Sequence, residues 1–143
     1  MNKRFTASLL AALLSYCPLV GADVYVIVSA DSLWSDFTQK DVLSLYMGRG
    51  RSVASEDVAT VYDLPKESPA REMFYASLTG MSPAQINSYW SRLIFTGKTL
   101  PPPSVPSEQA MLAQVRRNPR AIGYLSNPPA DPAVRTLLVV KGP

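Results

Sequence analysis

The sequence predicts a single α/β domain in which a small mixed sheet is flanked by helices. Three observations predict this class. Apolar runs rich in β-branched residues, typical of strands, alternate with segments whose apolar residues recur at helical spacing. The helical segments carry Ser or Thr before the first turn and Gly or Pro after the last. The chain that follows an apparent leader is 121 residues long, which suits one domain.

The predicted elements follow from local signals. In chain order they are a strand at 24–28, a helix starting at Thr38, a strand at 58–62, a helix at 68–78, a helix starting at Ser82, a helix starting at Ser107, and strands at 121–125 and 136–140. Thr38 with Asp41, and Ser82 with Gln85, are typical of capping boxes. Within the third helix, the apolar residues are expected to form one buried stripe: Ile86, Tyr89, Trp90, Leu93 and Ile94.

Residues 1–22 have the pattern of a secretory signal peptide, with a cationic start, an apolar stretch, and Val20 and Ala22 at the −3 and −1 positions of the expected cleavage site. The division expected is therefore a signal peptide at 1–22 and an α/β domain at 23–143, exported to the periplasm. An uncleaved anchor is the alternative, and the stretch is short for a membrane span. The mature chain would hold 12 basic and 11 acidic side chains, a net charge of +1, and no cysteine, because Cys17 leaves with the leader.

Composition excludes several functions. The chain has no histidine and its only cysteine lies in the predicted leader, so catalytic triads with His, thiol nucleophiles and the usual zinc sites are excluded. No cofactor and no nucleic acid partner are expected, because no basic patch accompanies the aromatic residues. A hydrolase is a third hypothesis, but no acidic pair such as Glu67 and Glu72 has a reason to face a substrate. The positive stretch 49–51 is either a contact surface or a solvated turn.

Four stretches, in the same order, resemble segments of the phosphate-type (type II) periplasmic substrate-binding proteins. They are FTQKDVLSLYMGR, VYDLPKESPAREMFY, SYWSRLIFTGK and NPRAIGYLS, and they span most of residues 24–126. The resemblance implies a periplasmic-binding-protein-like fold. Such receptors close two lobes around their ligand, whereas this chain has residues for a single lobe.

The second stretch contains the candidate ligand site. Where the family carries a Ser-Gly-Thr anion motif at a helix start, this sequence has Ser68-Pro69-Ala70, so one N–H donor and one hydroxyl are lost. Arg71 follows and could partly replace them as a surface cation. The resemblance therefore implies Ser68, Ala70 and Arg71, with Asp63 at the end of the preceding strand, as ligands of phosphate or another small oxyanion.

Two functions are compatible with these residues. The first is a non-enzymatic, exported phosphate- or oxyanion-binding protein related to the substrate-binding components of ABC transporters. The second is a ligand-free single-lobe interaction module that docks on a membrane sensor or transporter. A one-sided site would bind weakly, so tight capture would need a second wall from a homodimer or from another protein.

Overall fold

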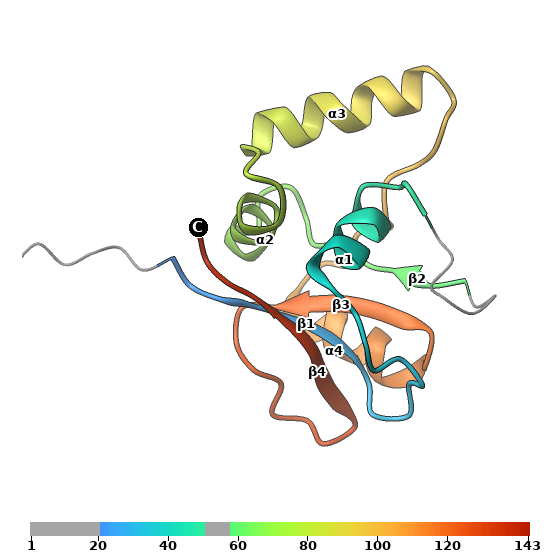
Figure 1. Ribbon diagram of the computed structural model, residues 1–143, viewed down its shortest axis with the longest axis vertical. Helices are drawn as coiled ribbons and strands as arrows, with labels where there is room; N and C mark the ends of the chain where they lie inside the picture. The colour runs from blue at the N-terminus through green and yellow to red at the C-terminus, as the bar shows by residue number, and fades with distance from the viewer. Residues whose placement is uncertain (1–20, 51–57) are drawn as a thin grey trace, which may run out of the picture.

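The computed structural model describes residues 21–50 and 58–143, and it has a four-stranded sheet surrounded by helices (Figure 1). In chain order the elements are β1 (Val24–Ser29), α1 (Gln39–Tyr46), β2 (Thr60–Val61), α2 (Pro69–Thr79), α3 (Pro83–Phe95), α4 (Glu108–Arg117), β3 (Ala121–Leu125) and β4 (Val134–Val140). The predicted α/β class, with a small mixed sheet and flanking helices, is confirmed.

The sheet has the order β2-β3-β1-β4, so the first strand of the domain lies inside it. β1 pairs antiparallel with both β3 and β4, and β2 pairs parallel with β3. Val26, Ile27 and Val28 of β1 are fully buried, as the continuous apolar run predicted. The central strand therefore supplies apolar side chains to both faces of the sheet.

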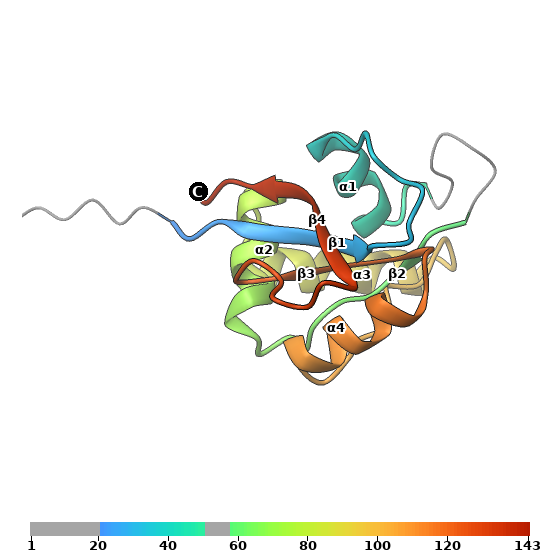
Figure 2. The same ribbon diagram turned by 90° about the horizontal axis from the view of Figure 1, so that it is seen from below.

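Helices cover both faces. Figure 2 shows α4 on one side of the sheet and α1 on the other, whereas α3 lies over α2 on the outside of the molecule (Figure 1). α4 approaches β3 closely at Gly123, where a Cβ atom would lie 2.9 Å from Cγ of Met111 and 3.2 Å from Cγ2 of Val115. Glycine is required there by space, because any side chain would meet the helix.

The predicted helix starts are confirmed in detail. The Thr38 side chain accepts a hydrogen bond from the Asp41 N–H while the Asp41 carboxylate accepts one from the Thr38 N–H, so the capping box is complete. The Thr38 hydroxyl also donates to Oδ2 of Asp41 at 2.6 Å, and this bond, followed by the one from the Thr38 N–H, lowers the pKa of Asp41. Ser82 and Gln85 form the same reciprocal pair at α3. Each cap satisfies backbone donors that a helix start leaves free.

Three expectations are corrected. β2 has only the two residues Thr60–Val61 rather than 58–62, because only these two pair with β3. β4 begins at Val134, two residues earlier than predicted, because pairing with β1 extends to Ser29. Ile94 is 48% exposed and does not belong to the buried stripe, although Ile86 and Trp90 do. The last turn of α3 projects beyond the helices that cover its earlier turns (Figure 1).

Most of the predicted signal peptide, residues 1–20, and Arg51 of the positive stretch lie outside the described residues. Within the described part of the chain, no helix is both long and apolar enough to cross a membrane. The two ends of the domain meet beside the sheet, where Nζ of Lys141 lies 3.0 Å from Oδ2 of Asp23.

Candidate oxyanion site at the start of α2

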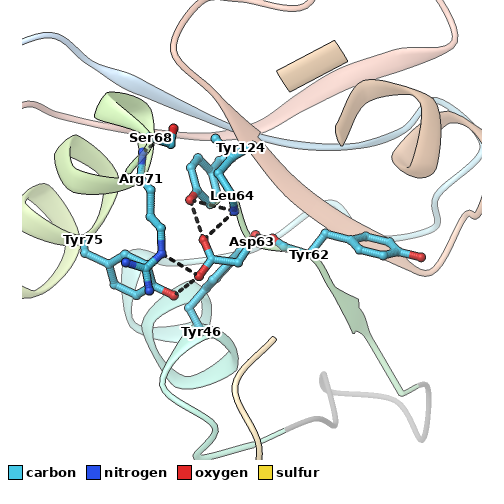
Figure 3. A network of polar contacts seen from close by, with 8 residues as sticks. All are labelled: Tyr46, Tyr62, Asp63, Leu64, Ser68, Arg71, Tyr75 and Tyr124. Carbon is cyan, nitrogen blue, oxygen red and sulfur yellow. Dashed lines mark hydrogen bonds and ion pairs between the residues drawn. The ribbon is translucent and has the colours of Figure 1, made fainter. Parts of the chain in front are cut away.

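Asp63 is the centre of a buried polar cluster between α1, α2 and β3 (Figure 3). It lies two residues after β2, and its backbone is held by the connector before α4: its N–H donates to Pro103 O and its carbonyl accepts from the Val105 N–H, each at 2.9 Å. The side chain is thereby fixed in place although β2 itself is short. Only 4% of Asp63 is exposed.

Four donors surround the Asp63 carboxylate. Oδ1 accepts hydrogen bonds from the Leu64 N–H at 2.8 Å and from the Tyr124 hydroxyl at 2.5 Å. Oδ2 accepts from Nε of Arg71 at 3.1 Å and from the Tyr75 hydroxyl at 2.9 Å. A buried carboxylate is tolerated only when it is paired and hydrogen-bonded, and this one has both kinds of partner.

Arg71 is therefore not the surface cation that the sequence suggested. Only 6% of the residue is exposed, its guanidinium pairs with Asp63, and its Cζ lies 4.9 Å from the centre of the Tyr75 ring. Helical geometry explains the position: Arg71 and Tyr75 are four residues apart on α2 and share the face that turns toward Asp63. The positive charge of Arg71 therefore pairs with a buried carboxylate in the interior of the domain.

The tyrosines around Asp63 are held in their neutral form. Burial, and then the Asp63 carboxylate, raise the pKa values of Tyr46, Tyr75 and Tyr124 well above the ordinary 10.0. Tyr46 donates its hydroxyl to Tyr62 O at 2.9 Å, so it too is satisfied. Neutral hydroxyls can donate to the carboxylate, which an ionised phenol could not do.

Ring contacts link the cluster to the apolar core. The Phe74 and Tyr124 rings stack at 3.9 Å between centroids and 7° between planes, and Tyr46 meets both edge-on. Sequence reasoning did not find this cluster, because its members come from α1, α2, β3 and the loop after β2. The available signal was an Asp directly after a strand and eight residues before an Arg, which does not by itself indicate burial.

The start of α2 keeps two hydrogen-bond donors that an external anion could use. The Ser68 Oγ accepts from the Arg71 N–H at 3.3 Å, so its own O–H remains available. Pro69 has no N–H, and the Glu72 N–H donates to Ser68 O. Among the described residues, none accepts from the Ala70 N–H, which is the second donor.

These two donors border a pocket of about 310 Å³ that Ser68, Pro69, Ala70 and Met73 of the α2 region share with residues 22–24, Glu108 and Ser126. Glu108 brings a carboxylate to this pocket. Its Oε1 accepts from the Ser126 N–H at 2.5 Å and from the Ser126 hydroxyl at 2.8 Å. A fixed negative charge on the wall disfavours an anion in the same pocket.

The structure thus divides the four predicted ligands into two pairs. Ser68 and Ala70 line the pocket, whereas Asp63 and Arg71 are joined to each other in the interior. Over residues 21–50 and 58–143, no group of three or more His, Cys, Asp or Glu side chains could hold a metal ion.

The fold is that of phosphate-type periplasmic substrate-binding proteins, as two solved structures show. One is an ABC-type phosphate transport receptor from Vibrio cholerae, with a TM-score of 0.61 and 16% identity over 82% of this chain and 46% of the receptor. The other is described as a phosphate ABC transporter substrate-binding protein with bound phosphate from Clostridium perfringens. It has a TM-score of 0.64 and 16% identity over 82% of this chain and 45% of that protein.

The chain therefore spans less than half the length of the two solved structures that it matches. No family model and no curated protein matches the sequence significantly. What the likeness establishes is the fold and the resemblance that the four sequence stretches predicted. The likeness shows the fold alone, because one fold can serve several functions.

Proposed function

We propose that this chain is an exported, non-enzymatic binding protein, related to the substrate-binding components of phosphate ABC transporters, that works together with a protein partner in the periplasm. The observation that carries the proposal is the likeness of one lobe to two phosphate-type receptors over 82% of the chain. The buried acid Asp63 accepts four hydrogen bonds from protein donors, which agrees with a non-enzymatic role.

The first candidate function is contact with phosphate or another small oxyanion at the start of α2. The Ser68 hydroxyl, the Ala70 N–H and the positive end of the helix dipole would provide it. A helix dipole contributes about 0.3–2 kcal/mol, whereas millimolar affinity already requires about 4 kcal/mol. Binding by this lobe alone would thus be weak, and a second wall from a partner or a second copy would be needed for capture.

The second candidate function is docking on a membrane sensor or transporter without a ligand. The specific observation that favours it is the ion pair of Arg71 with Asp63, which keeps this cation in the interior. The Glu108 carboxylate at the pocket wall favours it as well. Under this proposal the receptor lobe is retained as a scaffold for protein contact.

Chemical-shift titrations with phosphate and with sulfate separate the two candidates. The variants are Ser68→Ala, which removes one donor, and Glu108→Gln, which removes the negative charge but keeps an oxygen for Ser126. Arg71 variants are unsuitable, because they would disturb the interior. Ser68→Ala is also expected to cost about 1 kcal/mol of stability as a lost N-cap, so its unfolding must be measured in parallel.

If an oxyanion binds here, millimolar phosphate or sulfate should change the chemical shifts of residues 68–71. The affinity should be lower in Ser68→Ala and higher in Glu108→Gln. If neither anion shifts these residues up to tens of millimolar in either the wild type or Glu108→Gln, the oxyanion function is rejected and the docking function is retained.

A further inference from the structure

Beyond the end of α3 the chain returns toward β2 (Figure 1), and several large apolar side chains of these segments are exposed. We call this region the α3 edge and define its exposed apolar members, with their exposed fractions, as Val58 at 58%, Ile94 at 48%, Phe95 at 93% and Leu100 at 67%. Single exposed apolar residues are normal on proteins, but a group of them at one place marks an interaction site.

The α3 edge also contains a concave feature. A pocket of about 280 Å³ is formed by Leu45, Gly48, Trp90, residues 58–61 and residues 99–103. Gly48 has a φ of +69°, and a Cβ there would lie 2.9 Å from Cγ2 of Thr99 and 3.1 Å from Cη2 of Trp90. The glycine thus lets α1 approach Trp90 and the connector closely. The Tyr89 hydroxyl, which donates to Met47 O at 2.7 Å, fixes α3 on α1.

Among residues 21–50 and 58–143, the charged side chains named at this surface are all positive. Arg92 precedes Phe95 in the sequence by three residues and Lys98 follows it by three, and both are exposed. Neither has a carboxylate partner among the described residues. Arg49 follows Gly48 at the pocket. From residue 81 to residue 107 the sequence contains no Asp or Glu at all. Within the described part of the chain, the α3 edge therefore combines apolar and cationic side chains only.

We propose that the α3 edge docks a segment of another protein that carries a bulky apolar side chain flanked by carboxylates. The proposal deepens the partner-dependent function above, on which it rests, by assigning the surface and the chemistry of the partner. The pocket lined by Trp90 and Leu100 takes the apolar side chain, and Arg92 and Lys98 pair with the carboxylates. This surface is separate from the pocket at the start of α2, with which it shares no residue.

The same observations argue against the other occupants. A second copy of this chain would bring Arg92 and Lys98 against their own counterparts, and like charges across an interface cost several kcal/mol. Insertion into a lipid surface needs protruding apolar groups but no pocket, whereas the α3 edge has both the exposed Phe95 ring and a pocket lined by Trp90 and Leu100. A protein segment uses the pocket, the ring and the two cations together.

The test uses the purified protein and two synthetic peptides of equal length and hydrophobicity, one with Leu and Phe among Glu residues and one with Lys in place of every Glu. Chemical shifts at residues 90–103 report binding. We expect the Glu peptide to shift these residues and to bind at least about tenfold more tightly than the Lys peptide, as for two charge pairs in a partly desolvated site. Phe95→Ser and the double variant Arg92→Glu/Lys98→Glu should each abolish the shifts.

Leu33→Ser is the matched control, because Leu33 is 91% exposed outside the α3 edge, and it should bind as the wild type does. Equal affinity for both peptides, or no shift with the Glu peptide, overturns the proposal. So does binding to phosphatidylglycerol vesicles that Phe95→Ser abolishes, or a dimer on a sizing column that Phe95→Ser dissociates. The anion titration at residues 68–71 is read independently, so a failure here is distinguishable from a failure of the oxyanion function.

Discussion

The guanidinium of Arg71 lies 3.1 Å from the carboxylate of Asp63, and both side chains are more than nine-tenths buried. This pair joins α2 to the loop after β2 in the middle of an aromatic cluster. A buried ion pair of this kind is costly to break, because removal of one partner leaves the other charged and without compensation in the interior. The pair consequently has a structural role that a surface cation at a helix start would not have.

Replacement of Arg71 by Gln should therefore lower the free energy of unfolding by about 3–5 kcal/mol. Urea unfolding of the purified protein measures this loss. The matched control is Arg116→Gln, because Arg116 is 52% exposed and pairs with Asp131 at 3.4 Å near the surface. Its loss should remain within about 1 kcal/mol. Equal effects of the two substitutions would mean that Arg71 is solvated in solution.

The tyrosine cluster predicts a loss of stability in alkali. In the unfolded chain, Tyr46, Tyr75 and Tyr124 lose their protons near the ordinary pKa of 10.0, whereas burial and Asp63 keep them protonated in the folded state. Above that pH the unfolded state binds fewer protons, so the free energy of unfolding falls as pH rises. Each tyrosine contributes up to about 1.4 kcal/mol per pH unit.

Urea unfolding at a series of pH values from about 8 to 11 tests this slope. Tyr124→Phe provides the control, because it removes one of the three shifted groups. Its stability should be lower at neutral pH through the lost bond to Asp63, but it should decline less steeply in alkali. Identical slopes for the variant and the wild type would contradict the linkage.

Trp90 is expected to be structural. It is 5% exposed and packs against Gly48 beneath the α3 edge, so Trp90→Ala should reduce the free energy of unfolding by about 3–5 kcal/mol. Ile94→Ala on the same helix removes a half-exposed side chain and should change stability far less. Thermal unfolding of both variants gives the comparison, and an unchanged melting temperature for Trp90→Ala would show that the indole is not part of the core.

Gly123→Ala should destabilise the protein through steric conflict rather than through backbone strain. The added methyl group would meet Met111 and Val115 of α4, and overpacking of this kind costs about 1–3 kcal/mol. Gly50→Ala is the control, since nothing lies within 4 Å of a Cβ at that position. Denaturant unfolding of the two variants should differ accordingly; equal stabilities would imply that α4 moves away from β3 without cost.

The sequence predicted the helix starts well because their determinants are local. Thr38, Ser68, Ser82 and Ser107 each bond within their own first turn, so the pattern of residue types is sufficient. Strand limits depend instead on partners. β2 is short because β3 begins where only two of its residues can pair, and β4 is long because its pairing follows β1 to the end of that strand. The residues of β2 and β4 alone do not determine these limits.

The surroundings of the candidate ligands could be predicted only in part, for the same reason. The helix start at Ser68 and Ala70 was predicted, since capping is local, and their role as ligands stays a prediction. The burial of Arg71 could not be predicted, because the tyrosines and the Asp63 carboxylate that surround it come from separate elements. The helical spacing of apolar residues likewise predicted which face of α3 is buried, but it does not show how far along the helix other elements cover that face. The predicted burial of Ile94 was wrong for this reason.

The position of β1 inside the sheet has a consequence for how the molecule is made. Of the four strands, β1 is synthesised first, yet Tyr25 pairs with Leu125 on one side and with Val139 on the other. Contacts between such distant residues form late, because a long loop must close before they contribute. The sheet cannot be completed until β4 has been synthesised. For a protein that we propose is exported, this delay would keep the chain unfolded during its passage across the membrane.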